Sequence, residues 1–241
     1  GVLSTGFGGV SMTDSPGILT LWNDCVEEGI TEYERWYMAE HLPERVGVTG
    51  FRFGRRYLRV EGDRRYFTFY ELDRPDVLWS DEYLKCLSNP SDWTQRVMPN
   101  FKNTIRTACR RAASEGYAMG GHAVTIRFAG TPLLSQETEV EFEECFLPKL
   151  LDAQGVCHVH LWIATDDQTP SKTAETNMRG EDEMLSWAII AETVHKEDAL
   201  RISKNEKFFR EVSRLASVGM PEVGVYQLIA VLTEQMMLTE T

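Results

Sequence analysis

Two histidines separated by one residue, His158 and His160, have the spacing in this chain that most directly suggests chemistry. Successive side chains of a β-strand point to opposite faces, so both imidazoles share one face of the strand expected at residues 156–164. Such a pair can line a cavity as hydrogen-bonding and acid–base groups, or supply half of a metal site with His122 or Glu192 as a further ligand. Because the spacing fixes no third ligand, we predict the acid–base role and no metal.

His41 is a second candidate, because it stands at the end of the helix expected at residues 31–42. A neutral imidazole with an ordinary pKa of about 6.5 can accept or donate a proton near neutral pH. The alternative is a helix-terminal histidine that is placed favourably against the helix dipole. We predict that His41 is an acid–base group, and that the Tyr57 phenol, His158 or His160 polarises a substrate oxygen.

Arginines are concentrated in one expected strand pair, at Arg52, Arg55, Arg56, Arg59, Arg64 and Arg65. Guanidinium groups bind carboxylates and phenolates well. Strand alternation places Arg52 and Arg56 on one face, and we predict that they hold an anionic ligand. The alternative is that the cluster forms salt bridges with the many acidic residues of the chain.

Aromatic side chains on the expected elements can wall an apolar pocket for a planar substrate, although core packing explains most of them equally well. The predicted substrate-binding set is completed by Trp22, Trp36, Tyr70 and Trp162. Asn23 joins this set because a polar strand residue is costly to bury without a partner.

The elements that must position these residues are repeated along the chain. A Leu-Pro pair at residues 42–43 is followed seven residues later by Gly50, and the pattern returns at residues 147–148 and Gly155, an offset of 105 (147 − 42). Such a period is too long for solenoid repeats, which have about 20 to 50 residues. Two fused copies of a small domain are the simpler interpretation, with a pocket between them.

Each half of the chain has the hydrophobic pattern of a β-α-β-β-α-β unit. In the first half we expect strands at residues 18–25, 51–59 and 65–72, helices at 31–42 and 76–87, and either a strand or a helix at 105–111. In the second half we expect strands at residues 122–129, 156–164, 186–193 and 224–232, helices at 136–151 and 196–215, and a long loop at 165–183. The predicted fold is α+β, with two tandem ferredoxin-like repeats, at residues 12–115 and 120–235, that form a pseudo-dimeric α+β barrel.

Composition limits the possible partners. The 241 residues include 25 basic and 37 acidic residues, a net charge of −12, which argues against nucleic acid or an anionic membrane as a partner. The sequence has neither an apolar run of the roughly 20 residues that a membrane span needs nor a secretion signal, so we expect a cytoplasmic protein. The five cysteines lack CxxC spacing, which indicates reduced thiols. Residues 1–11, rich in Gly and Ser, are expected to be a leader added during cloning.

The stretch at residues 33–45, with its aromatic residues, His41 and Leu-Pro pair, and the Gly-Phe step at residues 50–51 resemble the dimeric α+β barrel superfamily, in particular its EthD-like and NIPSNAP-like members. The resemblance covers residues 18–112 well and residues 122–232 by spacing. It implies an enzyme or binding protein for small molecules, because members include dehydratases, polyketide cyclases, cofactor-free oxygenases and haem enzymes. The second copy departs from the motif, with Phe146 in place of His41 and Glu141 in place of Trp36, which implies one competent site.

The motifs of nucleotide-dependent enzymes and serine hydrolases are missing, since the sequence has no phosphate-binding loop, GxGxxG or GxSxG. We therefore expect a small-molecule enzyme that acts on a planar, anionic, aromatic or polyketide-like substrate by His-mediated proton transfer, as a lyase, dehydratase or cyclase. It needs no cofactor on this interpretation, with haem or a metal ion left open, and it forms a homo-oligomer. The alternatives are a cofactor-free or haem-dependent oxygenase on the same fold and a non-catalytic ligand-binding protein.

Overall fold

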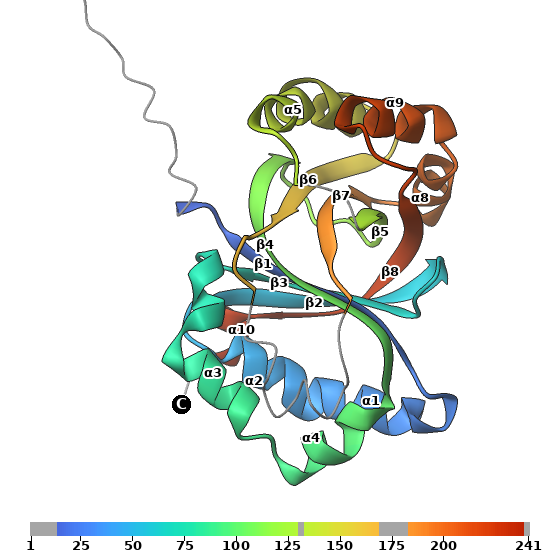
Figure 1. The fold of residues 1–241 in the computed structure, drawn as a ribbon. Helices are drawn as coiled ribbons and strands as arrows, with labels where there is room; N and C mark the ends of the chain where they lie inside the picture. The colour runs from blue at the N-terminus through green and yellow to red at the C-terminus, as the bar shows by residue number, and fades with distance from the viewer. Residues whose placement is uncertain (1–13, 130–132, 169–182, 239–241) are drawn as a thin grey trace, which may run out of the picture.

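The computed structural model describes residues 14–129, 133–168 and 183–238. The expected leader at residues 1–11 lies outside the described residues, as does most of the expected loop at residues 165–183. Eight strands close into an antiparallel barrel, and the helices of the two halves cover opposite sides of it (Figure 1).

The first half of the chain forms four strands with helices between them. Its elements are β1 (Gly17–Cys25), α1 (Ile30–Trp36), the π-helical turn η3 (Tyr37–His41), α2 (Leu42–Val46), β2 (Phe51–Glu61), β3 (Tyr66–Leu72), α3 (Asp81–Ser88), α4 (Asp92–Val97) and β4 (Phe101–Gly116). Residues 105–111 therefore belong to a strand. The helix expected at residues 76–87 begins later, because residues 76–79 belong to the short 3₁₀ turn η4 (Pro75–Trp79). The helix α3 begins only after Ser80, whose hydroxyl accepts a hydrogen bond from the N–H of Tyr83.

The second half repeats this order. Its elements are β5 (His122–Ala129), α5 (Gln136–Glu141), the π-helical turn η6 (Phe142–Phe146), α6 (Leu147–Leu151), β6 (Val156–Ala164), β7 (Leu185–Thr193), α8 (Lys196–Ser203), α9 (Glu206–Ala216) and β8 (Glu222–Thr233), followed by α10 (Glu234–Met237). The single helix expected at residues 196–215 is wrong. It is two helices, because the side chain of Asn205 caps a new helix by accepting a hydrogen bond from the N–H of Phe208.

The strand order confirms two tandem ferredoxin-like repeats. Around the barrel the order is β1-β3-β2-β8-β5-β7-β6-β4, so each copy contributes a four-stranded sheet with its own first and third strands at the centre. The two sheets join where β2 pairs with β8 and where β4 pairs with β6. The joints replace the edges that either sheet alone would expose. None of the helices in the described residues combines the length and the apolar composition that crossing a membrane requires.

The repeated Leu-Pro and Gly residues build the same local structure twice. A π-helical turn precedes each Pro, with the N–H of Leu42 bonded to the carbonyl of Tyr37 and the N–H of Leu147 to that of Phe142. Each turn of the chain into the next strand is made by a glycine in the left-handed region, with φ of 98° at Gly50 and 80° at Gly155. The sequence repeat thus marks positions where the backbone has special geometry.

Three hydrophobic clusters hold the molecule together. One lies between the first sheet and its helices, and a second occupies the same place in the second copy. The third fills the barrel interior with rings from both copies, among them Trp22, Tyr57, Phe67, Phe69, Trp162 and Tyr226. Ring centroids are 4.8 Å apart between Trp22 and Phe67 and 4.9 Å apart between Phe69 and Trp162. Stacked rings therefore occupy the centre of the barrel, where we expected the pocket.

The glycine turn of the second copy makes a prediction for stability. A Cβ at residue 155 would require an unfavourable φ and would overlap the carboxylate of Asp198 on α8. We expect Gly155→Ala to lower the free energy of unfolding by about 1 to 3 kcal/mol, measured by urea denaturation. Gly219→Ala is the matched control, because a Cβ there meets no atom within 4 Å. Equal stability of the two variants would contradict the prediction.

Candidate active site

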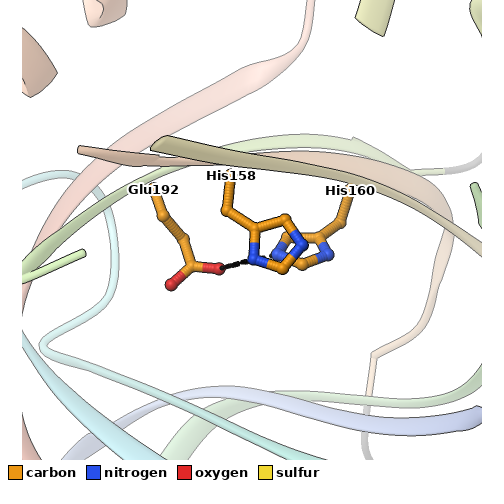
Figure 2. A group of neighbouring side chains, drawn as sticks. All are labelled: His158, His160 and Glu192. Carbon is orange, nitrogen blue, oxygen red and sulfur yellow. Dashed lines mark hydrogen bonds and ion pairs between the residues drawn. The ribbon is translucent and has the colours of Figure 1, made fainter. Parts of the chain in front are cut away.

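A polar cluster lies on the interior face of the barrel at the end where β6 begins and β7 ends. Figure 2 shows His158 and His160 side by side on β6, next to Glu192 on β7. The two ring centroids are 4.1 Å apart. The prediction that the histidines share a face is therefore confirmed, and Glu192 rather than His122 joins them. His122 lies beside the first turn of α8, where the charges of Lys196 and Glu197 influence its pKa.

Ser114 connects the two histidines. Its Oγ lies 2.8 Å from Nε2 of His158 and 3.1 Å from Nδ1 of His160. A β-bulge between Arg111 and Ala113 shifts the alternation of β4. Because of this shift, Ser114 faces the histidines on the neighbouring strand.

Glu192 is a fully buried carboxylate with hydrogen-bond partners on both oxygens. Nε2 of His160 lies 2.7 Å from Oε2, while Arg55 Nη1 and the N–H of Gly120 donate to Oε1 at 2.8 and 3.2 Å. Burial alone would raise the pKa of Glu192, but the hydrogen bond from His160 and the charge of Arg55 outweigh burial and hold the pKa below its ordinary value. Glu192 is therefore an ionised carboxylate at neutral pH.

His158 is the more exposed histidine, with 18% of its side chain accessible against 7% for His160. Its Nδ1 lies 3.2 Å from the carbonyl oxygen of Ala118 and 3.5 Å from Oε2 of Glu192. Burial, and then the neighbouring His160, lower the pKa of His158, while Glu192 acts in the opposite direction. The neutral imidazole, which can accept a proton, is thus favoured at physiological pH.

The two copies are equivalent here in backbone but not in side chains. Both β2 and β6 carry a bulge at matching positions, and Phe53 pairs with Glu71 as His158 pairs with Glu192. The 105-residue offset therefore aligns His158 with Phe53. It also aligns His160 with Arg55, and both of these side chains bind Glu192. Since Phe53 replaces one histidine, the described residues contain this cluster only once.

Arg52 and Arg56 do not share a face, so that prediction is wrong. The bulge between Phe51 and Phe53 shifts the alternation of β2 between them. Arg52 is 41% exposed and pairs with Asp73 at 2.9 Å. Arg56 is buried against α1, where its Nη1 lies 3.0 Å from Oε2 of Glu34 and its guanidinium lies 4.2 Å from the centre of the Tyr37 ring. The alternative of salt bridges describes both arginines, and neither of these contacts involves the His158 cluster.

His41 lies on the helix-covered side of the first sheet. Its ring stacks on Trp36, with centroids 4.3 Å apart, and meets the edge of Tyr37 at 5.0 Å. Tyr70 belongs to the same outer cluster. Asn23 also points to this side, where its Nδ2 donates to the Tyr33 hydroxyl at 3.0 Å. The sheet therefore separates this group from His158, and a chemical role for His41 stays a prediction.

Of the predicted aromatic residues, Trp22, Tyr57 and Trp162 face the barrel interior. The Tyr57 hydroxyl, which lies beside Arg55, and the indole N–H of Trp162 are buried donors with no acceptor among the described residues. Trp162 is on the same strand as His160, and their rings are 6.0 Å apart. Two buried donors without acceptors beside the cluster are suited to an oxygen atom of a ligand.

The charges in this cluster are less suited to binding a metal ion than to accepting a proton. His158, His160 and Glu192 each offer one ligand atom, and these atoms lie within 4.8 Å of one another. However, Arg55 already neutralises Glu192 at 2.8 Å, and its positive charge opposes a divalent cation on the same carboxylate. Haem fits poorly as well, because the rings of Trp22, Phe67, Phe69 and Trp162 fill the barrel interior that a macrocycle would need.

The surface beside the cluster is hollowed. A depression of about 610 Å³ is lined by residues 114–118, Leu151 and Cys157. It includes Ser114 and Ala118, which both contact His158. Through Ala118, the depression borders on His158.

Sequence reasoning did not assign a role to Ser114 or Arg55. Ser114 could not be found, because its orientation depends on a bulge just beyond residues 105–111, the segment left open between strand and helix. Arg55 could have been found, since the repeat that aligns Gly50 with Gly155 also aligns Arg55 with His160.

Comparisons with known proteins identify the fold. No family model matches the chain, and no curated protein sequence matches it. Among solved structures, an anthrone oxidase-like protein is similar, with 11% identity, 92% of this chain and 94% of that one covered, and a TM-score of 0.59. A protein provisionally described as a monooxygenase, from Fusobacterium nucleatum, has 10% identity, coverages of 91% and 94%, and a TM-score of 0.55. A second, from Lactobacillus acidophilus, has 9% identity, coverages of 91% and 97%, and a TM-score of 0.51. At these identities the likeness shows the fold alone, which is the α+β barrel.

The buried ion pair makes a prediction for stability. Arg55→Met would leave Glu192 buried without its cationic partner, and we expect the free energy of unfolding to fall by about 3 to 5 kcal/mol. Arg52→Met is the matched control on the same strand. Arg52 is 41% exposed, its pair with Asp73 lies at the surface, and its other partner Glu71 keeps Arg111, so we expect a loss below about 1 kcal/mol. Urea denaturation measures both. A loss at residue 55 no larger than that at residue 52 would contradict the prediction.

Proposed function

We propose that this protein is a small-molecule enzyme in which His158 takes a proton from a planar organic substrate at the end of the barrel. The observation that carries the proposal is the buried carboxylate of Glu192, which Arg55 and the N–H of Gly120 hold against the two histidines. A carboxylate in this position stabilises the imidazolium that forms when a neighbouring histidine accepts a proton. His158 is the more exposed member of the pair and its neutral form is favoured, so we assign it as the base.

The unpaired donors support an oxygen-bearing substrate. Removing a proton next to a carbonyl, or from a phenol, places negative charge on oxygen. The Tyr57 hydroxyl and the Trp162 indole N–H are buried donors that can stabilise this charge, with the Arg55 guanidinium close to Tyr57. Phe69 packs against both Tyr57 and Trp162, so a flat substrate would bind at the end of the barrel beside these rings and not among them. These features favour an enolisable aromatic ketone or a phenol, and a lyase, dehydratase or cyclase type of reaction.

An oxygenase is the second candidate, because similar structures carry the names anthrone oxidase-like protein and, provisionally, monooxygenase. It shares the first step. A carbanion formed by deprotonation can pass electrons to O2 without a bound cofactor. With anthrone, the methylene carbon would lose two hydrogens and gain one oxygen atom, and the other oxygen atom would leave as water.

Anthrone and 2-tetralone are suitable probes for the proton transfer. We expect the wild-type protein to accelerate exchange of their acidic methylene hydrogens for deuterium, followed by proton NMR under nitrogen. His158→Ala should slow this exchange by about 100-fold or more, the typical contribution of a general base. Oxygen uptake by the same mixtures in air would identify the oxygenase alternative.

Two further variants separate the possible bases. His122→Ala is the control for removal of a histidine outside the cluster. Loss of exchange in His41→Ala, with His158→Ala unaffected, would contradict the proposal and favour the base expected from the sequence. Failure of the wild-type protein to accelerate exchange of either probe would also count against the proposal.

The pH dependence follows from the lowered pKa of His158. The base must be neutral to act, so the exchange rate at low substrate concentration should stay constant as the pH falls to about 6.5 and decline only below it. Glu192, whose pKa is also lowered, stays ionised through this range. A decline that begins well above pH 6.5 would contradict the assignment. The measurement is the rate of deuterium exchange across a pH series.

A further inference from the structure

We infer that Ser114 joins His158 and His160 into a proton relay in which one added proton is shared by both rings. The two rings meet through the serine oxygen, with contacts of 2.8 Å to His158 Nε2 and 3.1 Å to His160 Nδ1. Each ring makes one further contact, 3.2 Å from His158 Nδ1 to the Ala118 carbonyl and 2.7 Å from His160 Nε2 to Glu192 Oε2. The chain of groups therefore has four contacts between two terminal acceptors.

When both histidines are neutral, this series of groups has too few hydrogens to make a hydrogen bond at every contact. Each contact needs one hydrogen, so four are required. A neutral imidazole supplies one and a serine hydroxyl supplies one, and the carbonyl and the carboxylate supply none. Three hydrogens therefore serve four contacts, and one contact stays unfilled until the chain takes up a proton.

The unfilled contact is expected at His158. The shortest contact joins His160 to the ionised Glu192, so the Nε2 of His160 keeps its hydrogen. Its Nδ1 then accepts the hydroxyl hydrogen of Ser114, whose oxygen accepts from Nε2 of His158. The lone pair of His158 Nδ1 is left facing Ala118 and Glu192, which both favour a proton at this atom.

An added proton completes all four contacts in two ways. In the first, it stays on Nδ1 and His158 is the imidazolium. In the second, His158 passes the hydrogen of Nε2 to Ser114 while Ser114 passes its own hydrogen to Nδ1 of His160. His160 is then the imidazolium, with its charge beside Glu192, and no atom is gained or lost between the two forms. The serine hydroxyl is the link that allows this exchange.

The surroundings favour a single added proton. Arg55 on β2 and the second imidazole oppose further positive charge, while Glu192 on β7 compensates one charge. Tyr57 on β2 and Cys157 on β6 are the other titratable groups near Glu192, and burial raises the pKa of both above its ordinary value, so they stay neutral. The two histidines should therefore titrate as one unit.

Nitrogen-15 NMR of histidine-labelled protein tests the relay without a substrate. In the wild-type protein we expect both rings to titrate with one common midpoint, each showing part of the chemical-shift change of complete protonation. In Ser114→Ala the rings should titrate separately, with midpoints about one pH unit or more apart. Ser114→Thr keeps the hydroxyl and should restore the common midpoint. His41, His122 and His195 serve as internal references.

Two results would overturn the relay. One is a wild-type titration in which a single ring shows the whole chemical-shift change of protonation, and the other is a Ser114→Ala variant that titrates like the wild type. Ser114→Cys, with a thiol that is a weak hydrogen-bond donor, replaces Ser114→Ala if the latter does not fold.

The role of the relay in catalysis rests on the proposed function, but the titration does not. A shared midpoint together with no deuterium exchange of the probes would leave the relay standing and remove the proposed function. Separate midpoints together with exchange that depends on His158 would do the reverse.

Discussion

The ion pair between Arg55 and Glu192 is the interaction on which the rest of the site depends. It joins a strand of the first copy to a strand of the second across the barrel, and it compensates a carboxylate that has no contact with solvent. Without the guanidinium, burial would favour the protonated acid, and His160 would lose its charged acceptor. The aromatic rings around the pair exclude water, which strengthens both the attraction and the cost of disrupting it.

Duplication of the fold allowed one end of the barrel to become chemically different. The backbone keeps its π-helical turns, glycine turns and strand bulges in both copies, yet the side chains at equivalent interior positions are His158 and His160 in one and Phe53 and Arg55 in the other. In a symmetric dimer every substitution would appear twice. In a fused chain, one copy can supply the histidines while the other supplies the arginine that holds their carboxylate.

Most of the fold could be predicted from local signals. Alternation of apolar residues located the strands, and the Leu-Pro and Gly repeat located the two copies, because each of these patterns reflects backbone geometry. The orientation of Ser114 and the separation of Arg52 from Arg56 could not be predicted, since each depends on a bulge that shifts the side-chain alternation. His158, His160 and Glu192 were accessible to sequence reasoning, because the first two share a strand face and the third was named, with His122, as a possible further ligand.

The length of β4 has a consequence for how the protein folds. This strand of 16 residues pairs with β1 of its own copy and with β6 of the other, as β2 and β8 pair at the opposite seam. Either half alone would therefore carry two unsatisfied edges, and it would tend to add strands from other chains. The halves are repeats in sequence, but we expect them to fold as one cooperative unit, because the β2–β8 and β4–β6 pairings must both form to close the barrel.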